Sequence, residues 1–166
     1  MRMEGAGQHT IRGNLFFGAQ RGGIQMLKGS GGTGCVLNII EDNTFTENLV
    51  GGVVVTSGAS QVPAAISQAN KITRNSFYKN YGLAIDLNPL PLNGIYAPPE
   101  FVTPNNGTYS ATLPNQDLDY PIITSATLNG NALSVQGHLG IAPGVGPFSG
   151  ITVEIYVAEN VPADQN

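Results

Sequence analysis

Three segments of the chain superimpose without gaps, and this internal repeat restricts the possible folds more than any other feature of the sequence. The segments span residues 9–16, 38–45 and 70–77 and read HTIRGNLF, NIIEDNTF and NKITRNSF. Their shared asparagines are 29 and 32 residues apart. A small residue and an aliphatic residue follow each asparagine after nine and ten positions, as Gly23-Ile24, Gly52-Val53 and Ala84-Ile85.

Within each unit the apolar residues alternate along the chain, as in strands, and show no helical period. Ile24 and Met26 face one way, whereas the column of Gln25, Val54 and Asp86 faces outward. A repeat of about 30 residues made of short strands and turns predicts an all-β fold, a parallel β-helix of about three coils. Adjacent coils stack at about 4.8 Å, so equivalent residues form columns.

The predicted columns are chemically uniform. The uniform columns are Asn14, Asn43 and Asn75; Phe16, Phe45 and Phe77; and Ile11, Ile40 and Ile72. The amide column suits a bend, because an Asn side chain can bond its neighbours above and below and tolerates left-handed backbone. A second amide column begins at Asn48 and Asn80, where the first coil has Ala19, and His9 aligns with Asn38 and Asn70.

Charged residues in the repeat alternate in sign between coils. The three columns are Arg12 with Glu41, Asp42 with Arg74, and Glu47 with Lys79. Such cross-strand pairs contribute about 0.2–1 kcal/mol each, so they tune the register more than they hold the fold.

The distribution of charged residues divides the chain into a basic and an acidic part and argues against some classes of partner. Residues 1–79 hold all seven Lys and Arg and carry +3, whereas residues 80–166 hold no base and carry −7. The overall charge of −4 argues against nucleic acid as the main partner. The apolar stretch 49–55 is too short to cross a membrane. Cys35 has no second Cys or nearby His, so a small loop or core residue is expected there.

The run Ile-x-x-Asn-x-Phe-x-x-Asn followed by Gly-Ile resembles the repeats of right-handed parallel β-helix proteins of the pectin-lyase-like superfamily. The resemblance covers roughly residues 5–90 and is more specific for fold than for activity. It implies the C-terminal coils of such a protein and an extracellular or cell-surface location. The passage 82–87, the turn-rich loop after it and residues 119–123 are similar to the way bacterial secreted β-helices lead into a β-sandwich-like module.

We therefore expect three parts: coils at 1–90, a capping loop or linker at 91–120, and a partial antiparallel β module at 121–166. In the last part, segments 122–128, 132–139 and 151–157 are predicted strands, and Asn129-Gly130-Asn131 predicts a hairpin. Val153 and Ile155 alternate with polar neighbours, as in a sheet with one buried face. Both ends are expected to continue into neighbouring domains of a longer chain.

Candidate site residues are few. Enzymes of the superfamily use carboxylates stacked on neighbouring coils, but no predicted column contains two acids. Asp86 is a candidate catalytic acid, although the pattern favours a surface aspartate because no charged neighbour shares its column. Asp117 and Asp119 could bind calcium, but two carboxylates fall short of the six or more oxygens that calcium takes, so a solvated or capping role is preferred. Tyr78 and Tyr81 could contact carbohydrate through an exposed aromatic patch.

Three functions stay open. The first is a non-catalytic extracellular β-helix module, structural or adhesive, that contacts a polysaccharide or cell-surface glycan. The second is the C-terminal part of a polysaccharide lyase or glycoside hydrolase whose catalytic coils lie upstream. The third is a calcium-dependent folding or capping module in the acidic half; otherwise no cofactor is expected.

Overall fold

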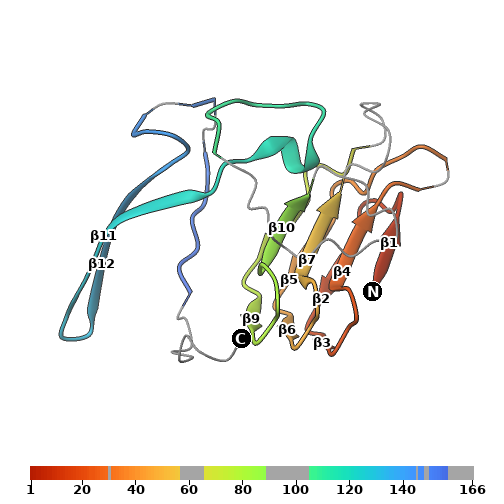
Figure 1. Ribbon diagram of the computed structural model, residues 1–166, viewed down its shortest axis with the longest axis horizontal. Helices are drawn as coiled ribbons and strands as arrows, with labels where there is room; N and C mark the ends of the chain where they lie inside the picture. The colour runs from red at the N-terminus through yellow and green to blue at the C-terminus, as the bar shows by residue number, and fades with distance from the viewer. Residues whose placement is uncertain (30, 57–65, 89–104, 145, 148–149, 157–166) are drawn as a thin grey trace.

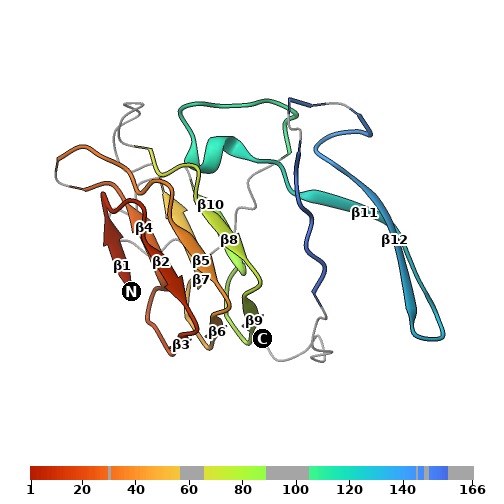
Figure 2. The same ribbon diagram turned by 180° about the vertical axis from the view of Figure 1, so that it is seen from behind.

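The computed structural model describes residues 1–29, 31–56, 66–88, 105–144, 146–147 and 150–156, and these residues form an all-β structure. The parallel β-helix prediction is confirmed for residues 1–29, 31–56 and 66–88 (Figure 1). Three parallel sheets run along the stack, in the orders β1-β4-β7-β10, β2-β5-β8 and β3-β6-β9. Viewed from behind, the coils again lie side by side in chain order (Figure 2).

Each coil contributes one strand to each sheet. The strands are β1 (Arg2–Glu4), β2 (Thr10–Arg12), β3 (Leu15–Phe17), β4 (Gly22–Leu27), β5 (Ile39–Glu41), β6 (Thr44–Thr46), β7 (Gly51–Thr56), β8 (Lys71–Thr73), β9 (Ser76–Tyr78) and β10 (Ile85–Asn88). In the middle coil, Ile40 lies opposite Ile11 and Ile72, and Phe45 lies opposite Phe16 and Phe77. The observed register is thus that of the aligned columns.

A stack of three phenylalanine rings occupies the inside of the coils. The ring centroids of Phe16 and Phe45 are 4.8 Å apart, and those of Phe45 and Phe77 are 5.0 Å apart. The small residues of the repeat make room for this stack. A Cβ at Gly23 would lie 2.7 Å from the Phe45 ring, and one at Gly52 would lie 2.5 Å from the Phe77 ring. The phenylalanine and glycine columns therefore depend on each other.

The three columns that begin at His9, Asn14 and Ala19 and continue through asparagines are called the asparagine ladders below. Each position in these ladders follows a residue with left-handed backbone. These residues are Gln8, Leu37 and Ala69; Gly13, Asp42 and Arg74; and Gly18, Glu47 and Lys79, with φ between 52° and 68°. The expectation that the asparagine itself takes the left-handed conformation is wrong, because the bend is completed one residue earlier. The asparagine side chain then turns along the stack and bonds the next coil.

Replacing the left-handed, exposed Leu37 by glycine is expected to stabilise the protein. A left-handed L-residue costs about 1–2 kcal/mol, and the added freedom of glycine in the unfolded chain returns about 0.4–1 kcal/mol of that. Leu37→Gly should therefore raise the melting temperature by about 2 °C. Leu15→Gly, at an exposed position within β3, is the control and should lower it. An unchanged or lower melting temperature for Leu37→Gly would contradict this account.

Strand β1 lies outside the predicted repeat. Met3 pairs with Met26 and is buried, so β1 adds a fourth member to the column that continues through Val55 and Leu87. The alternation of Arg2, Met3 and Glu4 carries this strand signal, but it is too short to register as a repeat.

The column of residues predicted to face outward is buried. Gln25, Val54 and Asp86 pair in register as predicted, but all three are buried, and Asp86 is only 6% exposed. The expected surface aspartate is therefore wrong. Parallel sheets are commonly covered on both faces, so alternation along β4 and β7 does not separate core from solvent. Cys35 is buried in the core cluster, as expected.

Beyond the coils lie a short 3₁₀ turn, η2 (Pro114–Asp117), and a hairpin of β11 (Pro121–Asn129) and β12 (Ala132–Leu139). The hairpin agrees with the Asn-Gly prediction. The strand predicted at 151–157 is wrong for residues 151–156, which form no strand and leave Val153 and Ile155 exposed, because none of the described strands pairs with them. Residue 157 and residues 91–104 of the predicted loop lie outside the described residues. In the described part of the chain, no helix has the length and apolar character needed to span a membrane.

Candidate functional site

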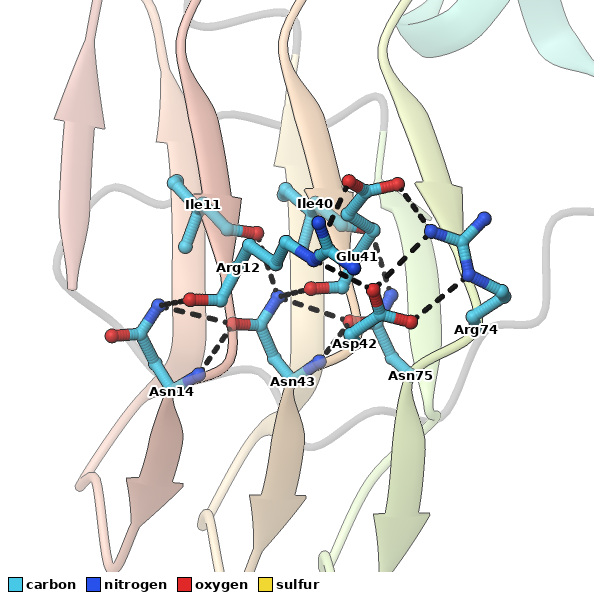
Figure 3. A network of polar contacts seen from close by, with 9 residues as sticks. All are labelled: Ile11, Arg12, Asn14, Ile40, Glu41, Asp42, Asn43, Arg74 and Asn75. Carbon is cyan, nitrogen blue, oxygen red and sulfur yellow. Dashed lines mark hydrogen bonds and ion pairs between the residues drawn. The ribbon is translucent and has the colours of Figure 1, made fainter.

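Asparagine side chains connect the three coils through one repeated set of hydrogen bonds (Figure 3). The backbone N–H and side-chain Nδ2 of Asn14 donate to Asn43 Oδ1 at 3.0 and 3.1 Å, and Asn43 donates to Asn75 Oδ1 in the same way. Parallel ladders run through Asn48 and Asn80, starting at Ala19, and through Asn38 and Asn70, starting at His9. These amides bind protein groups rather than presenting themselves to a ligand.

Four charged side chains meet on the surface beside the asparagine ladder (Figure 3). Arg12 Nε and Arg74 Nε lie 2.9 Å from the two carboxylate oxygens of Asp42, one on each side. Arg74 Nη2 also lies 2.6 Å from Glu41 Oε2, whereas Arg12 Nε is 3.8 Å from Glu41 Oε1. Glu41 and Asp42 thus share both arginines.

The electrostatics of this cluster hold Asp42 in its charged form. The hydrogen bond from Arg74 lowers the pKa of Asp42 below its ordinary value, and Arg12 adds to the effect. In turn, hydrogen bonds to Asp42 and Glu41 raise the pKa of Arg74. A general acid needs a carboxyl group that stays protonated near the working pH, so this environment is unsuited to that role for Asp42.

The third predicted charge pair is not formed. Among the residues that the structure describes, no ion pair joins Glu47 to Lys79. Both residues have left-handed backbone at the bend. They follow β6 and β9 rather than lying within the paired strands.

Asn115, which lies in the predicted capping loop or linker but was not singled out by the sequence, binds the last coil. Within the described ranges no further coil follows Asn70, and Asn115 in η2 accepts its ladder hydrogen bonds: Asn115 Oδ1 accepts from Asn70 N at 3.2 Å and from Asn70 Nδ2 at 3.4 Å. Asn115 N donates to Ser67 O at 2.9 Å. Asn115 thus bonds two segments of the last coil. Sequence offered one signal, an asparagine in a turn-rich stretch.

Glu154 and Tyr156 complete the cap on the neighbouring ladder. The Thr73 hydroxyl and the Arg74 backbone N–H, the latter at 2.8 Å, donate to the Glu154 carboxylate. The Tyr156 hydroxyl donates to the same carboxylate and faces the backbone N–H of Asn75. A groove of about 660 Å³ separates this segment from β8, so these polar contacts hold it to the last coil.

Acidification is expected to loosen this cap. The hydrogen bond from Thr73, and then that from Tyr156, lowers the pKa of Glu154 below 4.5. A carboxylate with a lowered pKa stabilises the folded state above its unfolded value, and this contribution is lost as the pH falls through the folded value. Glu154→Gln should lower the melting temperature by a few degrees at pH 7, and the difference from the unmodified chain should shrink toward pH 3. An equal difference at both pH values, in thermal unfolding, would contradict the assignment.

Burial raises the pKa of Tyr156 to about 12, and the Glu154 carboxylate adds to this effect. A group with a raised pKa contributes its stability below its unfolded value of 10.0 and loses it as the pH rises through the folded value. The contacts of both side chains therefore contribute fully to stability only at pH values above the pKa of Glu154 and below the pKa of Tyr156.

Asp117 and Asp119 are buried and accept hydrogen bonds from the loop at Asn106 and Gly107. Asp119 accepts the backbone N–H of Asn106 at 3.1 Å and that of Gly107 at 3.0 Å, and Asp117 accepts Asn106 Nδ2 at 2.6 Å. Of the solvated or capping role expected for the two aspartates, the solvated alternative does not hold, because both are buried and Asp119 accepts backbone N–H groups of the loop. Among the described residues, no group of three or more His, Cys, Asp or Glu side chains lies together as metal ligands would.

The predicted tyrosine patch lies at the last coil. Tyr81 is 76% exposed and Tyr78 is 41% exposed. Tyr78 continues the column of Phe17 and Thr46, in which Phe17 is exposed and Thr46 is buried. Two coil steps place Phe17 and Tyr78 about 10 Å apart along the stack. Asp86 lies on β10, opposite Val54.

No family model matches the chain, and no solved structure matches it.

Proposed function

We propose that the chain is a non-catalytic structural or adhesive module at the cell surface or outside the cell, a β-helix of the pectin-lyase-like type that contacts glycans through Tyr78 and Tyr81. The observation that carries the proposal is the pairing of Glu41 and Asp42 with Arg12 and Arg74. Acid-base hydrolysis requires one carboxyl group held protonated and another free to act as base or nucleophile. Glu41 and Asp42 are neutralised by arginines instead.

The ladders support a structural role. The asparagine amides of the coils bond backbone carbonyls and one another, as in the donation from Asn43 Nδ2 to Ile11 O at 2.9 Å. A network satisfied in this way rigidifies a stack and leaves few polar groups for substrate. Rigidity along one axis suits a stalk or a scaffold.

The exposed tyrosines support glycan contact. A tyrosine ring offers an apolar face and a hydroxyl at its edge, which matches the mixed apolar and polar surface of a sugar ring. Tyr81 is the more exposed of the two, so we assign it the larger share of the contact. The proposal includes no cofactor, and calcium at millimolar concentration is expected to leave the melting temperature unchanged.

A glycan array with the 166-residue chain tests the proposal. Binding without turnover is expected, with Tyr81→Ala weakening it more than Tyr78→Ala. Leu15→Ala is the control, because Leu15 is exposed on β3 but is not aromatic. Depolymerisation of any polysaccharide by the purified chain would overturn the proposal and favour a polysaccharide lyase or hydrolase. Binding that is unchanged in both tyrosine variants would overturn the assigned site.

A further inference from the structure

The hairpin of β11 and β12 has an apolar face that the described residues leave open. In its register, Leu128 lies opposite Leu133, and Ala126 lies opposite Val135. Thr127, Ser125 and their partners form the other, polar face. Leu128 and Leu133 are 67% and 54% exposed. The hairpin extends away from the coils in both views (Figures 1 and 2).

A groove continues this apolar face toward the cap segment. It has a volume of about 620 Å³ and is lined by Val135 and Leu139 of β12 and by Val153 and Ile155. A two-stranded hairpin is marginally stable on its own in water. Further strands on the hairpin would therefore stabilise it.

The two edges of the hairpin differ in their protection against pairing. Strand β11 begins at Pro121 and has a bulge between Ile123 and Ser125, and both features discourage a further strand. Strand β12 reads ALSVQGHL, with no proline and no Lys, Arg, Asp or Glu. The β12 edge is thus the one open to strand addition.

The sequence of β12 is complementary to itself in antiparallel pairing. With Gln136 opposite its own copy on a two-fold axis, Leu133 lies opposite Leu139, and Ser134 lies opposite His138. This register keeps the apolar residues of both copies on one face, as strand alternation demands. Residues 121–139 carry no Lys, Arg, Asp or Glu, so no like charges meet across the axis.

We propose that β12 pairs antiparallel with β12 of a second copy, which makes the chain a homodimer with a four-stranded sheet across the axis. Such an interface is isologous and closed. Each copy contributes the eight residues of β12 to the pairing. The inference is independent of the proposed glycan contact.

Sedimentation velocity on the 166-residue chain tests the dimer. We expect a mass twice 17.3 kDa at tens of micromolar protein. Gln136 is exposed, so the folded monomer tolerates its substitution. Gln136→Lys places two like charges on the axis and should weaken dimerisation by about tenfold or more, as should Gln136→Glu. An equimolar mixture of these two variants should restore the dimer.

Ser125→Lys is the matched control. Ser125 pairs with Gln136 on the same face but belongs to β11, away from the axis, so this variant should remain a dimer. A monomer at 17.3 kDa in the unmodified chain would overturn the proposal. So would a dimer that is indifferent to Gln136→Lys, or a failure of the mixed variants to recover, since either result would place the interface elsewhere.

Discussion

Asn43→Ala should be among the most destabilising single substitutions in the coils, with a loss of about 3–5 kcal/mol in the free energy of unfolding. Asn43 Nδ2 donates to Ile11 O and Glu41 O at 2.9 Å and to Asn75 Oδ1 at 3.1 Å. Its Oδ1 accepts from both nitrogens of Asn14. Alanine removes these bonds and leaves the partners unsatisfied in a buried bend, which costs more than the bonds contribute.

Chemical denaturation measures this loss, and Asn14→Ala is its control. Asn14 is exposed and belongs to the first coil, so its truncation should cost only about 1 kcal/mol. Equal losses in the two variants would show that the ladder does not bind the coils together.

Phe45→Ala should cost a similar amount, about 3–5 kcal/mol. Phe45 is fully buried between the rings of Phe16 and Phe77. Its loss removes apolar contact and opens a cavity in the centre of the stack, beside Gly23, whose missing side chain cannot fill it. Thermal unfolding should show a decrease of roughly 10 °C in melting temperature.

Phe17→Ala provides the comparison, since Phe17 is the next residue but lies 63% exposed on the outer side of β3. It should change stability by about 0.5 kcal/mol or less. A Phe45→Ala variant that unfolds at the same temperature as Phe17→Ala would contradict the assignment of the phenylalanine column to the core.

The coils could be predicted from sequence because each column repeats one chemistry. Ile40 and Phe45 recur at one spacing in three units, so a single alignment gives both the strands and their register. The scarcity of charge and the many glycines follow from the same architecture: tight bends and a close-packed phenylalanine column replace the charged surface that helices would display. The strand at Met3 could not be found this way because only one strand of that turn is present.

The ends of the stack were beyond this reasoning, because the residues that cap it do not repeat. Asn115, Glu154 and Tyr156 bind the last coil from 45 to 81 residues away in sequence. No local pattern links Glu154 to Thr73. The burial of Asp86 likewise depends on the packing of a sheet face, which alternation alone does not reveal.

Hydrogen exchange of side-chain amides by NMR tests the central claim most directly, that asparagine ladders join stacked coils. The Nδ2 protons of Asn43 are bonded between coils and buried, whereas Asn131 lies in the exposed hairpin turn. The Asn43 protons should exchange at least about a hundredfold more slowly than those of Asn131, as for groups released only by substantial unfolding. Exchange of Asn43 as fast as that of Asn131 would contradict the ladder and the coil stack built on it.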